Sequence, residues 1–158
     1  MKLMEAETLA REIIEQLAPF CEPLKIVTVG SIRRRRPFVH DIDLLLIPAN
    51  QGKLLVALKA IGEKRRGGGK IEERLYKGAQ VDLYFATRQT WATLLLIRTG
   101  SKAHNIFLTS LAKARGWHLY ANGDGLVNEK GVEIAGDTEE SFFTALGLPY
   151  REPWERLP

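Results

Sequence analysis

The sequence predicts an α+β fold in two parts, and three observations support this prediction. Apolar residues recur at helical spacing in residues 4–17. Apolar and polar residues alternate in 41–47 and 80–86, as is typical of strands with one face buried. The pattern is interrupted at 87–90, which is our candidate boundary between a domain at 1–88 and a second domain at 89–158.

Composition limits the classes of protein to consider. The 158 residues suffice for one ordinary domain or two small ones, and 45% hydrophobic content supports a packed core. The net charge of +4 suggests a polyanionic partner. A single cysteine excludes an internal disulfide and a cysteine-rich zinc site, and it fits a reducing compartment. Neither a signal peptide nor a membrane-spanning run is visible, so we expect a cytoplasmic (intracellular) protein with no membrane partner.

In the first part, the basic, glycine-rich segment 63–70 is predicted to be a mobile loop. A break at Gly30-Ser31 is expected to be followed by a helical turn at 33–36, and Lys77-Gly78 is predicted to join two strands. Helices are expected at 4–17 and 53–61, and strands at 25–29, 41–47, 71–76 and 80–86.

In the second part, Ser101 is a candidate N-cap and Gly116 a candidate helix end. Asp137 is expected to begin the last helix in a capping box with Glu140, and Gly147 to end it. The tail from residue 148 is expected to be extended. Helices are predicted at 91–98 and 101–115, and a hairpin at 117–120 and 126–128.

Three aspartates form the candidate catalytic and metal site. Asp41 and Asp43 are two residues apart, so their carboxylates leave the same face of one predicted strand. Asp82 alternates with apolar residues on a later strand, and all three converge if the two strands are neighbours. Because like charges repel, such a cluster favours bound cations, and magnesium prefers carboxylate and phosphate oxygens. The pattern predicts two Mg²⁺ ions, with Mn²⁺ as the alternative, acting in an in-line phosphoryl displacement.

A candidate phosphate site precedes these acids. Gly30-Ser31 follows a predicted strand and offers backbone amides and a hydroxyl, which suit phosphate oxygens. Of the four arginines that follow, at least one of Arg33 and Arg34 is placed to clamp a triphosphate. Arg35 and Arg36 are expected to be a solvated basic turn.

Each feature alone has a plainer interpretation. An Asp-x-Asp pair on a strand is more often a solvated face, and the combination with Gly30-Ser31 is what favours catalysis. The basic residues of 63–70 are as consistent with a solvated hairpin as with binding a nucleic-acid backbone. The candidate nucleic-acid contacts are Lys64, Arg65, Arg66, Lys70 and Lys102.

Residues 30–46, Gly-Ser-Ile-Arg-Arg-Arg-Arg-Pro-Phe-Val-His-Asp-Ile-Asp-Leu-Leu-Leu, resemble the palm signature of X-family (DNA polymerase beta-like) DNA polymerases. Val81-Asp82-Leu83 resembles the strand that carries the family's third aspartate. Residues 99–105, Thr-Gly-Ser-Lys-Ala-His-Asn, resemble its nucleotide-binding segment, which is more specific to polymerases than the palm signature. Residues 146–156 resemble the C-terminal end of the family, so the resemblance covers nearly the whole chain in order.

The resemblance implies a nucleotidyltransferase palm, a mixed sheet with helices on one face, followed by a small α+β nucleotide-binding domain. It also implies that Asp41 and Asp43 bind both metals, and that Asp82 binds the catalytic metal and polarises a primer 3′-hydroxyl. The partners would be nucleoside triphosphates, preferably dNTPs, and primer-template or gapped DNA, bound by a monomer acting in DNA repair. The implied nucleotide-binding residues are Gly30, Ser31, Arg33, Arg34, His40, Thr99, Gly100, Ser101 and Asn105.

Some positions depart from the family pattern. Ile97 and Arg98 stand where two aromatic residues usually help to exclude ribonucleotides, and Thr109 replaces a basic residue that often probes the template. His40 before Asp41 is similar to the His-Asp-x-Asp of terminal transferase and polymerase mu. Two alternatives stay open: a minimal nucleotidyltransferase that modifies a protein, tRNA or small molecule, and a non-catalytic nucleic-acid-binding module.

Overall fold

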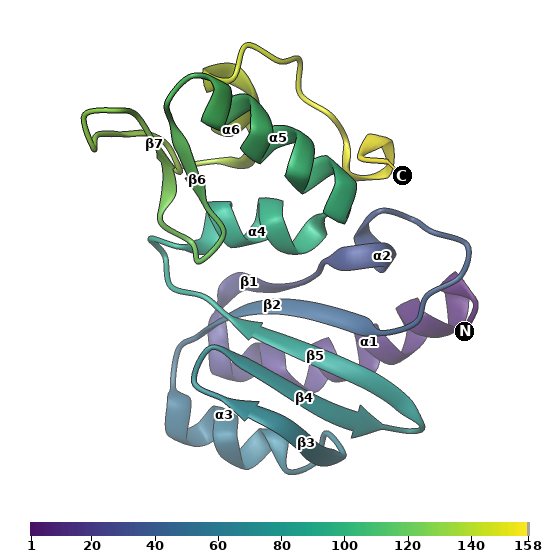
Figure 1. The fold of residues 1–158 in the computed structure, drawn as a ribbon. Coiled ribbons are helices and arrows are strands. Elements are labelled where there is room, and N and C mark those ends of the chain that lie inside the picture. Colours follow the sequence, from purple (N-terminus) through teal and green to yellow (C-terminus); the bar gives the residue numbers. More distant parts are fainter. Residues whose placement is uncertain (158) are drawn as a thin grey trace. The chain divides into compact units, whose positions relative to one another are not determined.

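The computed structural model describes residues 1–157, and the chain divides into two compact units. Unit 1 comprises Met1–Thr87 and unit 2 begins at Arg88, and each unit has its own hydrophobic core. Figure 1 shows the elements along the chain. No helix among the described residues has the length and apolar content needed to cross a membrane.

Unit 1 is built on a five-stranded mixed sheet with the order β1-β2-β5-β4-β3. The central strands β2 and β5 are parallel, and the other neighbours are antiparallel. Helices α1 and α3 pack into the same core as the apolar face of the central strands, which confirms the expected mixed sheet. The strands are β1 (Cys21–Thr28), β2 (Ile42–Pro48), β3 (Glu63–Gly68), β4 (Ile71–Tyr76) and β5 (Ala79–Phe85). The helices are α1 (Leu3–Leu17), α2 (Gly30–Arg33) and α3 (Gln51–Leu58).

Spacing of apolar residues explains why these elements pack together. The buried residues of α1 follow one another at intervals of four, three and four, which places them on one helix face. On β2 and β5, the side chains of Ile42, Leu44, Val81 and Leu83 are fully buried. Asp43 and Asp82 alternate with them and lie on the opposite face of the sheet. The hydrophobic pattern therefore turns the acids away from the core. The buried residues of α1 are Ala6, Ala10, Ile13 and Leu17.

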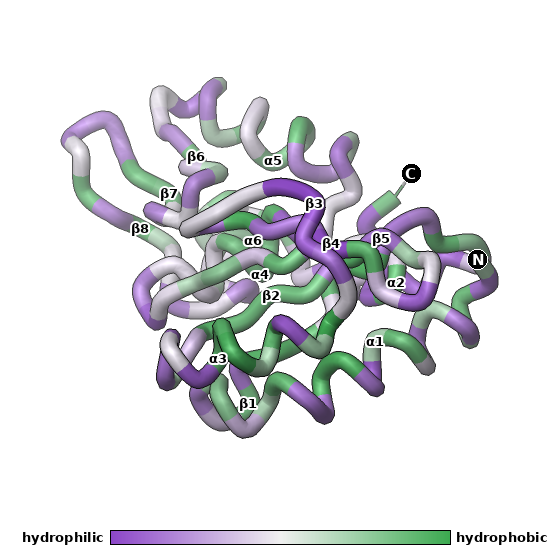
Figure 2. Tube along the Cα trace, turned by 90° about the horizontal axis from the view of Figure 1, so that it is seen from below, coloured by the Kyte–Doolittle hydropathy of each residue, from purple (hydrophilic) through white to green (hydrophobic). Residues whose placement is uncertain are grey.

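Segment 63–70 was predicted to be a loop, and this prediction is wrong. Residues Glu63–Gly68 form strand β3, which pairs with β4 at the edge of the sheet. All six residues of β3 are exposed, and Figure 2 shows the strand as hydrophilic. An edge strand with no buried face needs no apolar alternation, and basic side chains discourage edge-to-edge aggregation. The backbone pairing with β4 therefore forms without a sequence signal for a strand.

The bounds of strand β1 and of helix α2 also differ from prediction. Strand β1 begins at Cys21 rather than Lys25, because an edge strand tolerates Pro23 and the irregularity between Cys21 and Ile26. The helical turn expected at 33–36 is α2, which begins at Gly30 and ends at Arg33. A positive φ at Arg35 is incompatible with continuing the helix. Gly30-Ser31 is thus the first turn of a helix and not a break before one.

Unit 2 combines three α-helices with a three-stranded antiparallel sheet, order β6-β7-β8. Ser101 caps α5 by accepting a hydrogen bond from the backbone N–H of His104 (3.2 Å), which confirms the predicted N-cap. The last helix is capped by Thr138, which accepts from Ser141 N (3.1 Å), and not by the predicted Asp137–Glu140 box. The elements are α4 (Trp91–Thr99), α5 (Lys102–Ala114), β6 (His118–Tyr120), β7 (Gly125–Val127), β8 (Glu133–Ala135) and α6 (Glu139–Ala145).

Two features of unit 2 were absent from the sequence analysis. Strand β8 extends the predicted hairpin to three strands, and its three residues are too few to show a periodic pattern. The tail was expected to be extended from residue 148, but Pro153–Glu155 form a short 3₁₀ helix. Pro153 at the start of this turn supplies the helical φ that favours it.

Candidate active site

Asp43 and Asp82 are register partners on the neighbouring parallel strands β2 and β5. Residues paired across two strands have side chains on the same face of the sheet, so the two carboxylates project from the sheet side by side. Asp41 lies immediately before β2, which begins at Ile42, one residue later than the predicted strand start. The sheet therefore brings together the two strands whose proximity the sequence analysis required.

The surroundings of Asp43 shift its pKa upward. The pKa of Asp43 is raised to about 7, chiefly by burial and in addition by the charges of Asp82 and Asp41. A hydrogen bond from Tyr84 and the charge of Arg34 act in the opposite direction. The Tyr84 hydroxyl donates to Asp43 Oδ1 at 3.4 Å. A half-buried carboxylate beside two others is an arrangement that a cation stabilises.

Gly30 packs directly against Asp43. Its φ of +59° is one that glycine adopts readily, and a β-carbon there would overlap the Asp43 carboxylate, with Cγ at 3.0 Å. The backbone N–H of Val29 also donates to the carbonyl oxygen of Asp43 (2.9 Å). The first turn of α2 is thus held against the acid at position 43, which brings the candidate phosphate turn and the candidate metal ligand together.

The arginines after this turn differ in their surroundings. Arg33 and Arg34 are half-buried, whereas Arg35, Arg36 and His40 are exposed. Burial lowers the pKa of Arg34, and Arg36 lowers it further, while the nearby charge of Asp43 raises it. The guanidinium of Arg34 is therefore near enough to Asp43 to influence it and is the arginine best placed toward the acids.

Three side chains beside the aspartates were missed by the sequence analysis. Gln80 and Tyr84 lie two residues on either side of Asp82, on the same face of β5, and Glu73 is the register partner of Asp82 on β4. Gln80 Nε2 donates to both carboxylate oxygens of Asp82 and to Glu73 Oε1. The spacing of two from Asp82 was the signal available for Gln80 and Tyr84. Glu73 has no such signal because strand pairing places it there.

The donor set of this site fits a hard divalent cation. Carboxylate oxygens are the ligands that Mg²⁺ and Mn²⁺ prefer. Across residues 1–157, no group of three or more histidine, cysteine, aspartate or glutamate side chains is arranged so that it could hold a metal ion.

In unit 2, the predicted nucleotide-binding residues lie where α4 ends and α5 begins. Thr99 and Gly100 are buried, and Gly100, with φ +72°, follows the last residue of α4. Ser101 is 5% exposed, and its hydroxyl is used as the N-cap of α5. Asn105, one turn later, donates through Nδ2 to the carbonyl oxygen of Ile97 (2.8 Å). These residues form one local cluster, and Lys102 beside them is exposed.

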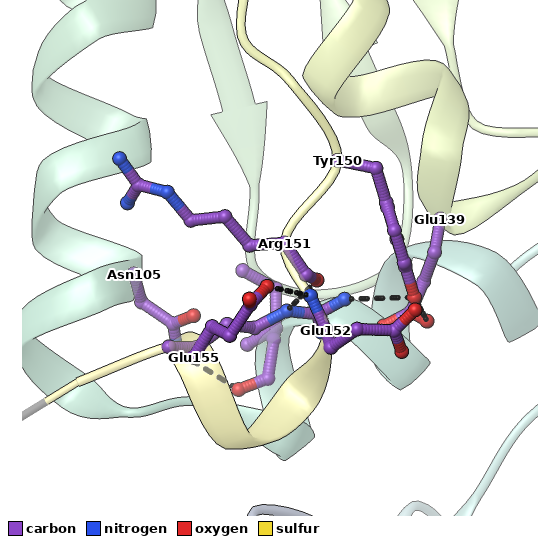
Figure 3. Close-up of polar contacts among 8 residues, drawn as sticks. Asn105, Glu139, Tyr150, Arg151, Glu152 and Glu155 are labelled. Carbon is purple, nitrogen blue, oxygen red and sulfur yellow. Dashed lines mark hydrogen bonds and ion pairs between the residues drawn. The ribbon is translucent and has the colours of Figure 1, made fainter.

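Arg156 is the most important residue of unit 2 that the sequence analysis missed. It is fully buried and donates to Glu139 Oε2 (2.7 Å), the Tyr150 hydroxyl (3.2 Å) and the Arg151 carbonyl (3.0 Å). Figure 3 shows the side chains of Tyr150 and Glu139 directed toward the same place. A buried, fully hydrogen-bonded ion pair fixes the C-terminal tail to α6. An arginine in a polar tail gives no sequence signal of burial.

The candidate nucleic-acid contacts of unit 1 divide into two groups. Arg65, Arg66 and Lys70 are exposed. Lys64 is also exposed, but its Nζ lies 3.4 Å from Glu72 Oε1, and Glu72 in turn pairs with the buried Arg74 (3.1 Å). Lys64 is therefore committed to an ion-pair network on the core side of the sheet.

The chain is similar to DNA polymerases both in sequence and in structure. Residues 94–157 match the family described as DNA polymerase beta thumb. The DNA polymerase/3′-5′ exonuclease PolX of Bacillus subtilis is 34% identical over 152 residues, which cover 92% of this chain and 26% of that protein. DNA polymerase lambda of Rattus norvegicus is 29% identical, covering 96% of this chain and 32% of that protein. Repair DNA polymerase X of African swine fever virus (isolate Warthog/Namibia/Wart80/1980) is 30% identical, covering 84% of this chain and 81% of that protein.

Among solved structures, Leishmania infantum polymerase beta in its ternary P/T complex matches with a TM-score of 0.79 and 22% identity, covering 100% of this chain and 77% of that chain. The fold, with acids aligned on parallel strands beside a glycine turn, is that of polymerase beta-like nucleotidyltransferases. Since the viral relative is similar over 81% of its length, the chain belongs to the X family of DNA polymerases. The chain spans 26% of the bacterial relative and 32% of the rat relative.

Proposed function

We propose that this protein is a DNA polymerase that adds nucleotides to a DNA 3′-hydroxyl. Family membership supports the proposal. The single observation that carries it is the alignment of Asp43 with Asp82, with Gly30 packed against the Asp43 carboxylate. This arrangement supports the proposal, because the acids that would hold cations and the turn that would hold phosphate oxygens lie together within one unit of the chain.

In the proposed reaction, the primer 3′-oxygen attacks the α-phosphorus of the incoming nucleotide. A new P–O bond forms, the bond between the α- and β-phosphates breaks, and pyrophosphate leaves while the hydroxyl proton is lost. Asp41, Asp43 and Asp82 would hold two Mg²⁺ ions, or Mn²⁺, which when bound neutralise charge on the attacking and leaving oxygens. Asp82 would also orient the 3′-hydroxyl. The protein contributes positioning and charge stabilisation, and no covalent enzyme intermediate is needed.

Each unit carries residues that we propose as nucleotide contacts. We assign the β- and γ-phosphates to the first turn of α2 and to the arginine side chains that follow it, because backbone amides and guanidinium groups match phosphate oxygens. We assign the sugar and base to the cluster at the start of α5. The proposed nucleotide-binding residues are Gly30, Ser31, Arg33, Arg34, His40, Thr99, Gly100, Ser101 and Asn105.

The DNA backbone would be contacted by exposed basic residues. Arg65, Arg66 and Lys70 on and after β3, and Lys102 at the start of α5, are the proposed contacts, because they are exposed. Lys64 would contribute less, since it is ion-paired with Glu72. We further propose that the protein acts in DNA repair, as the names of the viral relatives suggest, and that it does so as an intracellular monomer.

A primer-extension assay tests this proposal. Single-stranded, blunt, primed and one-nucleotide-gapped DNA would each be offered with dNTPs and with NTPs in the presence of Mg²⁺. We expect extension of primed or gapped DNA with dNTPs. Failure on every substrate, together with transfer of a labelled nucleotide to protein or tRNA, would instead establish the alternative nucleotidyltransferase. Failure of both, with DNA binding retained, would leave a binding module.

A further inference from the structure

Gln80 connects two carboxylates that lie opposite each other on β5 and β4. Its Nε2 is 3.2 Å from Asp82 Oδ1, 3.3 Å from Asp82 Oδ2 and 3.2 Å from Glu73 Oε1. Asp82 and Glu73 are register partners on the antiparallel strands. Like charges at such positions repel, so a donor that reaches both carboxylates stabilises their proximity.

The orientation of the Gln80 amide follows from its partners. Ionised carboxylates only accept hydrogen bonds, and a glutamine amide donates only through its nitrogen. The nitrogen carries two hydrogens, so one is directed to Glu73 and the other is shared between the oxygens of Asp82. Gln80 is half-buried, as are Glu73 and Asp82, and this limits the competition from water for these bonds.

The neutrality of the amide is significant. A lysine or arginine at position 80 would place a full positive charge in the fork of the Asp82 carboxylate and compete with a divalent cation for it. An amide donates a hydrogen bond without cancelling the negative charge. Gln80 thus fixes the direction of the carboxylate while leaving its charge available.

We propose that Gln80, anchored by Glu73, is a positioning residue of the polymerase reaction. It holds the Asp82 side chain in the direction needed to receive a divalent cation together with Asp41 and Asp43. This inference rests on the proposed function, and it assigns Gln80 and Glu73 roles beyond the three aspartates. Partners that orient metal ligands in this way affect metal affinity or activity by about 10- to 100-fold when they are removed.

The first test is kinetic. Gln80→Met keeps the length of the side chain and removes the donor, and we expect it to lower kcat about tenfold while the KM for dNTP changes less than about twofold. Gln80→His retains a neutral N–H donor and should recover part of the loss. Gln16→Met is the matched control, because Gln16 lies exposed on α1 and donates only to the Glu12 carbonyl in the same helix. Wild-type kcat in Gln80→Met would overturn the inference.

The second test measures metal binding without turnover. Mn²⁺ titration followed by electron paramagnetic resonance should show weaker binding by about tenfold in Gln80→Met and no change in Gln16→Met. Thermal unfolding of each variant shows whether the fold is retained, and Gln80→His provides the comparison if Gln80→Met unfolds. Unchanged Mn²⁺ affinity in a folded Gln80→Met variant would overturn the inference even if its activity fell.

The anchoring role of Glu73 is tested by a double-mutant cycle. Glu73→Leu removes the acceptor, so the double variant Glu73→Leu/Gln80→Met should bind Mn²⁺ no more weakly than Gln80→Met alone. Additive losses would refute the anchoring role. If the wild-type chain extends no primer, the proposed function fails, whereas the Mn²⁺ measurements still decide whether Gln80 positions Asp82.

Discussion

The Cα of Gly30 lies so close to the carboxylate of Asp43 that a β-carbon at position 30 would overlap the acid. This contact joins the proposed phosphate turn to the strand that carries the proposed metal ligand Asp43. The close approach and the positive φ both require glycine, so position 30 reports directly on the integrity of the proposed site.

Gly30→Ala is therefore expected to lower the free energy of unfolding by about 1–3 kcal/mol and to reduce primer extension at least tenfold. Urea denaturation and steady-state extension measure the two effects. Gly52→Ala is the control, because Gly52 lies in α3 and its β-carbon would meet only Asn50 Oδ1 at an ordinary 3.6 Å. Equal stability and activity of both variants would contradict the geometry described for position 30.

Arg156 is expected to be essential for the stability of unit 2. Arg156→Ala leaves the carboxylate of Glu139 buried without its ion-pair partner, and we expect a loss of about 3–5 kcal/mol by urea denaturation. Arg156→Lys should also destabilise, because one ammonium cannot replace the guanidinium contacts to Tyr150 and Arg151. Lys77→Ala, which breaks an exposed pair with Glu12, should have a much smaller effect. A similar loss in all three variants would argue against a special role for Arg156.

His104 should make the stability of unit 2 depend on pH. The pKa of His104 is lowered to about 4, chiefly by burial and in addition by the charges of Arg156 and Arg151. The unfolded state therefore takes up a proton at a higher pH than the folded state does. Above the ordinary histidine pKa of about 6.5, His104 does not reduce the free energy of unfolding. As the pH decreases toward 4, the free energy of unfolding falls by up to about 1.4 kcal/mol per pH unit.

His104→Phe removes this titration and places a similar ring between Phe107 and Phe143. Urea denaturation at pH 7 and pH 5 should show a smaller loss at pH 5 for the variant than for the wild type. His118→Phe, at an exposed position, is the matched control. The same pH slope for wild type and His104→Phe would exclude His104 as the cause.

Basic residues at the β3 edge should determine the salt dependence of DNA binding. Arg66→Ala is expected to weaken binding and to reduce the slope of log affinity against log salt by about one. Lys64→Ala removes the same charge but should have a smaller effect, because Lys64 is paired with Glu72. Fluorescence anisotropy with labelled DNA at several salt concentrations separates the two variants. A larger change in the salt slope for Lys64→Ala than for Arg66→Ala would contradict the assignment of Arg66 as the stronger DNA contact.

Sequence patterns were sufficient for the elements with one buried face. The helix of 4–17 and the strands around Asp43 and Asp82 follow from apolar spacing, because burial selects those positions directly. The same alternation indicated that Asp43 and Asp82 project from the face of the sheet opposite the apolar one. The parallel pairing that aligns them is a tertiary relationship, and the sequence analysis stated it only as a condition.

Other features depend on contacts that no local pattern records. Strand β3 exists because β4 offers a backbone partner, although its own six residues are exposed. Glu73 lies beside Asp82 because β4 pairs with β5. Arg156 is stabilised in its buried position by its ion pair with Glu139, which is 17 residues away in sequence. In each case the energy comes from a partner distant along the chain, so the local sequence carries no signal.

The central claim is that Asp41, Asp43 and Asp82 act as one metal-dependent centre. It is tested most directly by single-turnover extension of a primed DNA by wild type and Asp82→Ala in Mg²⁺, with dNTP binding measured separately. We expect a rate loss on the order of 100-fold or more, with dNTP affinity within a few-fold of wild type. Undiminished extension by Asp82→Ala would contradict the claim.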